Sequence, residues 1–320
     1  MIFNRPDLTE HVFAAIAEAR PRKLLVIADG PRPERAGEAE KCAAARAIVE
    51  RVDWECDVLK NYSDINMGCA RRPATGLRWV FEQVEEAIIL EDDCVPHPTF
   101  FPFCEELLEK YRNDKRVMHI SGNNFFFRQE SMPFSYFFSR YCLSWGWATW
   151  RRAFQYYDPE IKLWPSVRNN SWLLDILGDP RAVDHWKNVY DLTLASMDNV
   201  NTWDFQWVFA CWVQGGLSIL PSANLVSNIG FRGDATHTKR MEDKCANFAT
   251  TEMIFPLTHP ACMMRDREID ELIFNQVVLP PQPQPNLYAR LRQKCAATLP
   301  TPLRKSISSL RSRLSSSYSN

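Results

Sequence analysis

Three consecutive acidic residues, Glu91, Asp92 and Asp93, directly follow the apolar run 88–90 in this chain of 320 residues. Adjacent carboxylates repel one another unless a cation or hydrogen-bond donors compensate their charge. A hard divalent ion with oxygen ligands, Mg²⁺ or Mn²⁺, is the natural compensation, and one or two carboxylates can hold it while positions stay free for diphosphate oxygens. The triplet therefore predicts a metal-assisted site at which a diphosphate binds and leaves.

The alternative for this triplet is a solvated turn between a strand and a helix, which is the commoner setting of an isolated acidic run. The position of the acids favours the functional interpretation. They come immediately after a run with the character of a buried strand, and Pro96 and Pro98 fix the exit of the chain before the next helix. A merely solvated loop does not need such an exit.

A second candidate site is centred on Asp204, which lies among aromatic residues in the stretch 201–207. A carboxylate in this setting can remove the proton of an attacking hydroxyl group, which contributes about 10²–10⁴ to a rate. Asp204 is therefore our candidate general base. The alternative is that Asp204 only caps a helix, as Asp often does. Trp203 and Trp207, at helical spacing, favour packing in the core over stacking on a sugar ring.

The elements that must position these residues alternate along the chain. Val- and Ile-rich runs predict strands over 24–28, 87–90 and 117–120, with a weaker one over 56–59. Helices are predicted from Asp7 onward, over 34–51 and 71–85, and over 100–111, where Phe100, Phe103, Leu107 and Leu108 form one apolar stripe. This alternation predicts an α/β fold with a mostly parallel, Rossmann-like sheet flanked by helices.

The first apolar run is short, because only Met1-Ile2-Phe3 precedes the turn-like Asn4-Arg5-Pro6. A central parallel strand usually has about five residues, so the short run is consistent with a truncated start. Ligands of an open parallel sheet bind at the carboxyl ends of its strands. The polar residues after the four runs are therefore expected at one edge: Asn4-Arg5, Asp29-Gly30, residues 61–68 and Glu91 to Asp93.

Composition limits the class of protein. Residues 287–320 carry seven Lys or Arg and no acid within a net charge of −1, so the rest of the chain is acidic and a poor nucleic-acid binder. The ten cysteines are scattered, which predicts reduced, buried thiols. Without a leader or a run of about 18 apolar residues, we expect a cytoplasmic protein. Its basic tail predicts either peripheral contact with the inner face of a membrane or a solvated, flexible segment.

Several motifs together resemble the GT-A glycosyltransferases, and specifically the bacterial family of nucleotide-diphospho-sugar transferases, also called hemolytic-protein-like glycosyltransferases. The resemblance covers nearly everything from Phe3 to about Thr238. More distantly, the chain is similar to the N-acetylglucosaminyltransferase I family, which shares a Glu-Asp-Asp triplet before a Phe-Phe helix. The motifs are Phe3-Asn4-Arg5-Pro6, Ala28-Asp29-Gly30-Pro31-Arg32, Asn66-Met67-Gly68-Cys69, Leu90 to Cys94, Trp145 to Trp150 and Asn228-Ile229-Gly230-Phe231.

The resemblance implies roles for individual residues. Arg5 and Asp29 would hold the uracil, Glu91 the ribose, and Asp93 the Mn²⁺ or Mg²⁺ ion, with Asp92 supporting the diphosphate side. Where the distant relative has a uridine-contacting histidine, this chain has Gly76. The relative's general base falls in a Trp-Asp setting similar to that of Asp204.

The aromatic-rich sequence after residue 122 and the Pro-rich segment after residue 279, together with the resemblance, indicate an organisation of the chain. Residues 1–122 would form the nucleotide-sugar-binding half of one GT-A domain, residues 123–279 its aromatic-rich acceptor half, and residues 280–320 a Pro-rich linker and basic tail. Within the acceptor half, the polar loop 221–238 could close over the donor, and His237 could contact the diphosphate or the metal, a structural role being an equal alternative. Arg151 or Arg152 could meet phosphate.

We therefore expect a metal-dependent glycosyltransferase that moves a sugar from a nucleotide diphosphate, UDP above all, to a carbohydrate or lipid-linked glycan of the bacterial cell envelope, with inversion. Two rivals remain open. A nucleotidyltransferase also places acids after a parallel strand, although it usually needs a Gly-rich, basic triphosphate loop near the first strand. The second rival is a protein that binds a nucleotide sugar or a glycan without turning it over, and the short apolar run Met1-Ile2-Phe3 supports it.

Overall fold

The computed structural model describes residues 1–125, 133–196, 201–233 and 246–279. The chain divides into two compact units, Met1–Ile273 and Phe274–Asn320. All six predicted site residues belong to the first unit. The second contains the short π-helix η2 (Phe274–Val278). His237 and the basic tail, for which we predicted contacts with donor and membrane, lie outside the described residues.

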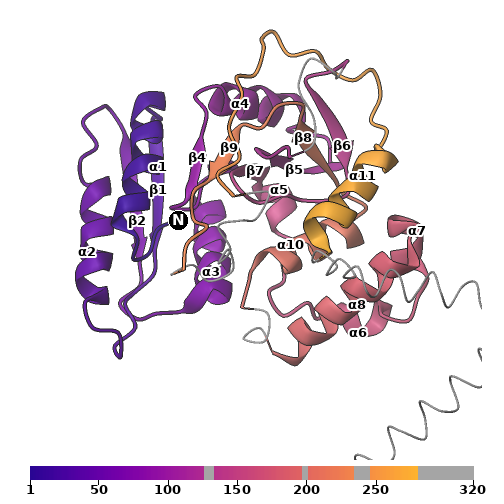
Figure 1. The fold of residues 1–320 in the computed structure, drawn as a ribbon, viewed down its shortest axis with the longest axis horizontal. Helices are drawn as coiled ribbons and strands as arrows, with labels where there is room; N and C mark the ends of the chain where they lie inside the picture. The colour runs from indigo at the N-terminus through magenta and orange to yellow at the C-terminus, as the bar shows by residue number, and fades with distance from the viewer. Residues whose placement is uncertain (126–132, 197–200, 234–245, 280–320) are drawn as a thin grey trace, which may run out of the picture. The chain divides into compact units, whose positions relative to one another are not determined.

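A small parallel sheet forms the first part of the fold. Strand β1 (Lys23–Ala28) pairs along its whole length with β2 (Asp57–Tyr62), which confirms two of the predicted strands. Helices α1 (Pro6–Ala19) and α2 (Glu38–Val49) contact each other beside it (Figure 1). A proline at the first helical position starts α1 at a fixed φ. Phe13, Val26 and Ile48 join helices and strand in one apolar cluster.

A second sheet has five strands in the order β3-β7-β5-β8-β6. Only β5 and β8 are parallel, whereas β3 and β5 pair antiparallel with β7, and β6 pairs antiparallel with β8. The predicted single, mostly parallel sheet is therefore not confirmed, although the mixed α/β class is. The strands are β3 (Glu86–Ile89), β5 (Val117–Ser121), β6 (Tyr136–Ser139), β7 (Trp147–Trp150) and β8 (Leu217–Pro221).

The sequence of the second half does not reveal the direction in which its strands pair. Every residue of β6 and β7 is buried, so these strands carry no alternation of apolar and polar side chains. Continuous burial identifies a core strand but does not reveal the direction in which it pairs. A third, two-stranded antiparallel sheet joins β4 (Cys94–Pro96) to β9 (Val226–Asn228).

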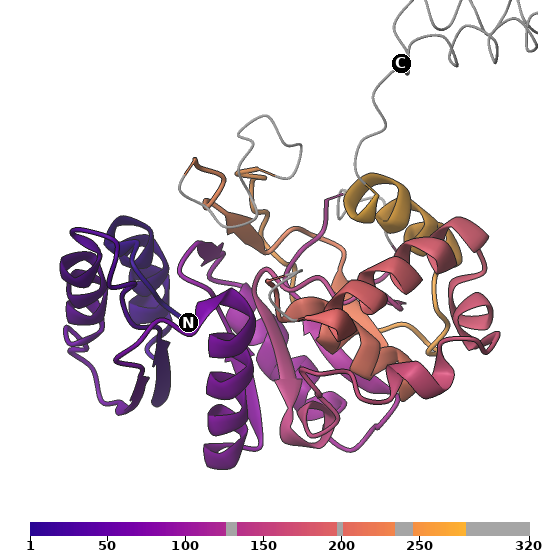
Figure 2. The same ribbon diagram turned by 90° about the horizontal axis from the view of Figure 1, so that it is seen from below.

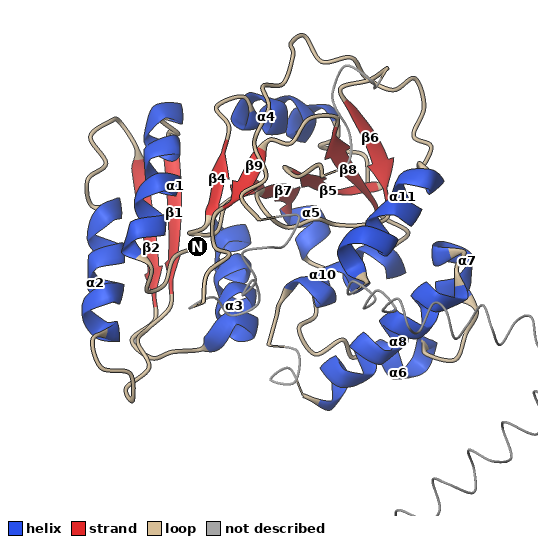
Figure 3. Ribbon diagram, in the orientation of Figure 1, coloured by secondary structure: helices blue, strands red, loops and turns tan. Residues whose placement is uncertain are grey.

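Helices cover these sheets, as Figures 2 and 3 show. They are α3 (Gly68–Gln83), α4 (Phe100–Lys110), α5 (Arg151–Phe154), α6 (Trp164–Val167), α7 (Trp172–Leu177), α8 (Pro180–Ala195), α10 (Asp204–Val213) and α11 (Arg267–Ile273), in addition to α1 and α2. Helix α4 buries the predicted stripe Phe100, Phe103, Leu107 and Leu108. Helices α7 and α8 contact each other in the aromatic half.

The tryptophans of the aromatic half form a stacked core, as predicted. Trp147 stacks on His119 at 5.0 Å and on Trp203 at 5.4 Å between ring centroids. Trp207 donates to His119 Nδ1 at 3.0 Å. Burial lowers the pKa of His119 to about 3, so this ring is neutral and acts as a hydrogen-bond acceptor within the core.

The structure bears on the prediction that the cysteines are reduced, buried thiols. All eight cysteines among the described residues are free thiols. Cys42, Cys94, Cys104 and Cys211 are buried as expected, but Cys262 is exposed, which corrects the prediction that every thiol is buried.

In the part of the chain that the structure describes, no helix combines the length and apolar character that a membrane crossing requires.

Candidate functional site

A cavity of about 470 Å³ is lined by all six predicted site residues. Its volume lies in the range of small-molecule sites, roughly 300–1,000 Å³. The loops after β1 and β3 and the start of α10 contribute to its wall, together with the segment that precedes α1. Part of the group predicted to meet at one edge lines this cavity, although its members do not follow strands of one sheet: Asn4, Arg5, Asp29, Asn66, Gly68 and Glu91 to Asp93. The six predicted site residues are Arg5, Asp29, Glu91, Asp92, Asp93 and Asp204.

Arg5 forms ion pairs with two acids of the triplet. Its Nη1 lies 3.0 Å from Asp93 Oδ2. Its Nε lies 3.4 Å from one oxygen of Asp92, and its Nη2 contacts the other. Burial lowers the pKa of Arg5, but Asp92 and Asp93 outweigh burial and raise the pKa overall. Arg5 therefore supplies part of the positive charge that the triplet requires.

Glu91, the third acid, is half-buried beside the indole of Trp203. Trp203 Nε1 donates to Glu91 Oε1 at 3.3 Å. Burial, together with the charges of Asp93 and Asp92, raises the pKa of Glu91 to about 8. At neutral pH the Glu91 carboxyl is therefore mostly protonated and can donate a hydrogen bond as well as accept one.

This raised pKa predicts that the contribution of Glu91 to the free energy of unfolding falls between about pH 5 and pH 8. In the folded protein the pKa of Glu91 is about 8, whereas an unfolded chain has about 4.3. The folded state thus binds the proton more tightly. The resulting stabilisation is fully present below the unfolded pKa and is lost as the pH rises through the folded pKa. The slope of this contribution against pH is at most about 1.4 kcal/mol per pH unit. Urea unfolding at a series of pH values, in the absence of divalent ions, measures it.

The Glu91→Gln variant isolates this effect, because it keeps the size of the side chain and removes its titration. We expect a smaller loss of stability toward pH 8 in the variant. Glu40→Gln, at an exposed position of α2, is the matched control and should keep the wild-type slope. Equal slopes for Glu91→Gln and the wild type would contradict the raised pKa.

Asp29 lies directly after β1 and is buried, and its carboxylate organises the loop that leads into α3. Its Oδ1 accepts from the backbone N–H groups of Gly30 and Met67, both at 2.9 Å. Its Oδ2 accepts from the Gly68 N–H at 3.0 Å and from the Asn66 side-chain amide at 3.1 Å. A carboxylate offers about four acceptor positions, and these four donors fill them. In the structure Asp29 therefore positions the cavity wall rather than offering a vacant acceptor to a base.

Asp204 is the first residue of α10, and the preceding residue, Trp203, occupies the N-cap position without a side-chain cap. Asp204 Oδ1 accepts from the Phe205 N–H at 3.0 Å and from the Thr202 hydroxyl. An acidic residue in the first helical turn also interacts favourably with the helix dipole. Asp204 thus supports the helix start and lines the cavity with the same side chain.

Strand β9 holds the loop that follows it close to Asp93. Cys94 pairs with Asn228 in the ladder, and the Ile229 N–H donates to Asp93 O at 2.9 Å. Asn228 Oδ1 accepts from the Gly230 N–H at 2.8 Å. A Cβ atom at Gly230 would overlap the Asp93 carboxylate. Part of the predicted closing loop is thus anchored beside the acids, while residues 234–238 lie outside the described residues.

Two residues that line the cavity were not predicted as site residues, and two arginines that were considered as phosphate ligands do not line it. Trp203 was interpreted as core, yet it both stacks in the core and contacts Glu91. A signal existed, because it directly precedes Asp204. Cys69 was noted only as part of a motif, and it lines the cavity. Arg151 and Arg152 do not line it. Arg151 pairs with Glu85, and Arg152 donates to three backbone carbonyl groups.

Gly76, at the position of the relative's histidine, is not among the residues that line the cavity. It lies within α3, and a Cβ atom there would clash with the side chain of Ile27 on β1. The glycine therefore permits close packing of helix on strand. A histidine at this position would overlap the side chain of Ile27.

The donor set fits a hard divalent ion held by few protein ligands. Among the described residues, no group of three or more His, Cys, Asp or Glu side chains is arranged to hold a metal. Mg²⁺ does not require such a group, because one or two carboxylates hold it together with substrate phosphates and water. Arg5 offsets part of the charge of Asp92 and Asp93, and Glu91 and Asp204 add further oxygens to the same cavity.

Comparison with known proteins gives no family assignment. A scan against protein-family models found no matching family, and a search of curated proteins found no match.

Proposed function

We propose that this chain is a metal-dependent glycosyltransferase with a GT-A-like fold, which moves a sugar from a nucleotide diphosphate to a hydroxyl group of a glycan. The observation that carries the proposal is the cavity itself. It brings five carboxylates, the Arg5 guanidinium that pairs with two of them, and the indole of Trp203 around a volume of about 470 Å³. This combination of an acidic triplet and a separate acid at a helix start matches what transfer from a diphosphate requires.

The donor side of the proposed site is built from the triplet. Asp93 would hold Mn²⁺ or Mg²⁺, which would neutralise the charge that develops on the departing diphosphate. Arg5 keeps Asp92 and Asp93 in place through its two ion pairs. Glu91, which can both donate and accept a hydrogen bond, suits the ribose hydroxyl groups. UDP is the proposed nucleotide. Asp29 would contribute to its binding indirectly, because its carboxylate positions the loop that forms part of the cavity wall.

The acceptor side is built around Asp204. Both of its hydrogen bonds within the described residues use Oδ1, so Oδ2 is the oxygen that can accept a proton from an acceptor hydroxyl. The Thr202 hydroxyl and the start of α10 fix the orientation of the carboxylate. A general base that acts directly on the attacking hydroxyl leads to inversion at the sugar carbon. The proposed acceptor is a carbohydrate or a lipid-linked glycan, which the basic tail would help to reach on a membrane surface.

A screen of nucleotide sugars by thermal shift, with and without Mn²⁺, tests the proposal. We expect one UDP-sugar to raise the melting temperature only with the metal, and the protein to release UDP slowly from that donor. Release of pyrophosphate from a nucleoside triphosphate and a sugar phosphate would indicate a nucleotidyltransferase. Donor binding with no release of nucleotide under any acceptor condition would indicate a binding protein. Either result would contradict the proposed transfer.

The contact between Gly230 and Asp93 yields a sharper prediction. In Gly230→Ala the new methyl group overlaps the Asp93 carboxylate, so the carboxylate must move away from its position beside Arg5. A misplacement of about 1 Å at a reacting centre costs roughly 100-fold in rate. We therefore expect a loss of about this size in the release of UDP from the donor, together with weaker Mn²⁺ dependence.

Gly233→Ala is the matched control for this prediction. It lies three positions further along the same loop, and a Cβ atom there meets no atom within 4 Å. Its activity and melting temperature should equal those of the wild type. Full activity in Gly230→Ala would show that the position of Asp93 does not matter for turnover.

A further inference from the structure

Two cysteine thiols lie together in the core of the aromatic half, between α10 and the segment that follows β6. Cys211 on α10 is almost fully buried. Cys142, three residues beyond the end of β6, is half-buried and packs against the same apolar cluster. The two side chains share a hydrogen bond, and both thiols are free. They form a dithiol in the interior of the first unit.

Independent contacts hold the two backbone segments that carry these thiols. Trp212 Nε1 on α10 donates to Arg140 O at 2.7 Å. On the other side of the pair, His119 Nε2 lies 3.0 Å from Leu143 O, and its Nδ1 accepts from Trp207 of α10. These bonds lie before and after the cysteine in each segment. The closeness of the two thiols is therefore fixed by the surrounding core as well as by their own hydrogen bond.

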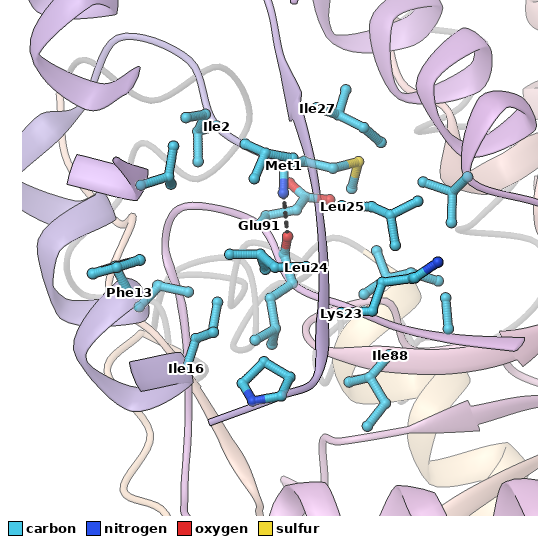
Figure 4. Close-up of a pocket in the computed structure, with 18 of the residues that line it drawn as sticks. Met1, Ile2, Phe13, Ile16, Lys23, Leu24, Leu25, Ile27, Ile88 and Glu91 are labelled. Carbon is cyan, nitrogen blue, oxygen red and sulfur yellow. Dashed lines mark hydrogen bonds between the residues drawn. The ribbon is translucent and has the colours of Figure 1, made fainter. Parts of the chain in front are cut away.

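Other thiols among the described residues have different surroundings. Cys69 lines the carboxylate cavity, and Cys262 is exposed. No cysteine of the described part of the chain lines the second cavity, of about 300 Å³, whose wall is mainly apolar and where the Met1 amino group donates to Leu90 O at 2.7 Å (Figure 4). Cys262 is thus a useful comparison, because a reagent in solution reaches it directly.

We propose that Cys142 and Cys211 are a redox-active pair, which a peroxide converts into a disulfide bond and a thiol reductant restores. A disulfide requires a sulfur separation of about 2.05 Å. Sulfurs that already share a hydrogen bond need only a short approach to reach it. In a reducing compartment such a bond is transient and senses the redox state, whereas a permanent disulfide only stabilises a fold.

The two thiols have different parts in the reaction. Burial, followed by the hydrogen bond with Cys142, raises the pKa of the Cys211 thiol well above its usual value, so Cys211 stays protonated. The half-buried Cys142 is the thiol that the oxidant reaches first. Peroxide transfers one oxygen atom to the Cys142 sulfur, which gives a sulfenic acid and water. The Cys211 sulfur then attacks the Cys142 sulfur, and its proton leaves with the hydroxyl group as a second water. The two electrons that the sulfurs lose reduce the peroxide.

The bond would tie together two walls of the carboxylate cavity. Cys142 is followed closely by Ser144 and Trp145, which line that cavity. Cys211 lies two helical turns beyond Asp204 on α10. A covalent link would therefore limit how the two walls move relative to each other. Its effect on transfer rests on the proposed function, whereas the formation of the disulfide does not.

The test treats the full, folded wild-type chain with hydrogen peroxide, blocks the remaining thiols with N-ethylmaleimide and identifies the peptides by mass spectrometry without reduction. We expect a cross-link between the peptides of Cys142 and Cys211, whose mass lacks the two thiol hydrogens, and dithiothreitol should reverse it. Oxidation of Cys262 shows that the dose of peroxide is sufficient. The proposal is overturned if no cross-link is present once Cys262 is oxidised, or if the cross-link forms only in urea.

The Cys211→Ala variant tests the order of the two steps. The sulfenic acid of Cys142 then lacks its attacking thiol and should persist, so labelling of Cys142 by dimedone should rise at least about tenfold over the wild type. Cys262→Ala is the matched control and should keep the cross-link and the wild-type labelling of Cys142. Unchanged labelling in Cys211→Ala would also overturn the proposal.

No measurement in this test depends on turnover, and the wild-type cross-link requires no variant to fold. The two proposals for this chain can therefore fail separately. A chain that forms the disulfide but releases no UDP from any donor would contradict the proposed function alone. A chain that transfers sugar but forms no cross-link would contradict the redox-active pair alone.

Discussion

Replacing Asp204 by Asn is expected to lower the rate of sugar transfer by about 10²–10⁴-fold, because the variant cannot take the proton of the acceptor hydroxyl group. Asn keeps an oxygen at the Oδ1 position, which accepts from the Phe205 N–H and the Thr202 hydroxyl. The helix start should therefore persist, and the melting temperature should change little. Transfer to an acceptor, measured with saturating donor and Mn²⁺, gives the rate, and the loss should fall on kcat rather than on KM for the donor.

The matched control for this variant is Asp179→Asn. Asp179 caps α8, where it accepts from the Arg181 N–H at 2.8 Å, and it does not line the carboxylate cavity. It should transfer sugar at the wild-type rate. Wild-type transfer in Asp204→Asn would remove the proposed base and would leave Asp204 with its role at the start of α10.

Replacing Asp93 by Asn is expected to abolish measurable Mn²⁺ binding and to reduce transfer by at least about 10³-fold, since the charge on the departing diphosphate then lacks its partner. The ion pair between Asp93 and Arg5 is also lost, but Asp92 still binds both Nε and Nη2 of Arg5. Arg5 should therefore stay in place. Titration of Mn²⁺, followed by the electron paramagnetic resonance signal of the free ion, measures binding without any turnover.

Asp57→Asn is the control for general effects of charge. Asp57 lies on β2 and pairs with Lys23 at the surface at 3.0 Å. It should leave Mn²⁺ binding unchanged. If Asp93→Asn binds Mn²⁺ as tightly as the wild type, the ion is held elsewhere, and the division of roles within the triplet is wrong.

Local patterns in the sequence predicted most elements of the first half. The strands at 24–28 and 87–90 and the apolar stripe of α4 occur as expected, because each is set by residues close together in the chain. The sheet organisation was not predictable in this way. Strand β7 pairs with β3 and β5 across long stretches of chain, and its buried sequence carries no sign of direction.

The sequence predicted that the acidic residues lie at the ends of secondary-structure elements, because some directly follow a strand and one begins a helix. Their partners were less predictable. Arg5 and Asp92 are far apart in sequence, and nothing local indicates that one binds the other. Asp29 shows a further limit, since three of its four donors are backbone N–H groups, those of Gly30, Met67 and Gly68, which no pattern of side chains reveals.

The double role of Trp203 has a spectroscopic consequence. Its ring stacks on Trp147 at an interplanar angle of 21° while its Nε1 bonds to Glu91 at the cavity. Two indoles in such contact couple their electronic transitions, and a hydrogen bond to one of them shifts that coupling. A nucleotide that takes Glu91 away from Trp203 would therefore change the near-ultraviolet circular dichroism of the protein. Occupancy of the cavity can thus be followed optically, with no label and no acceptor present.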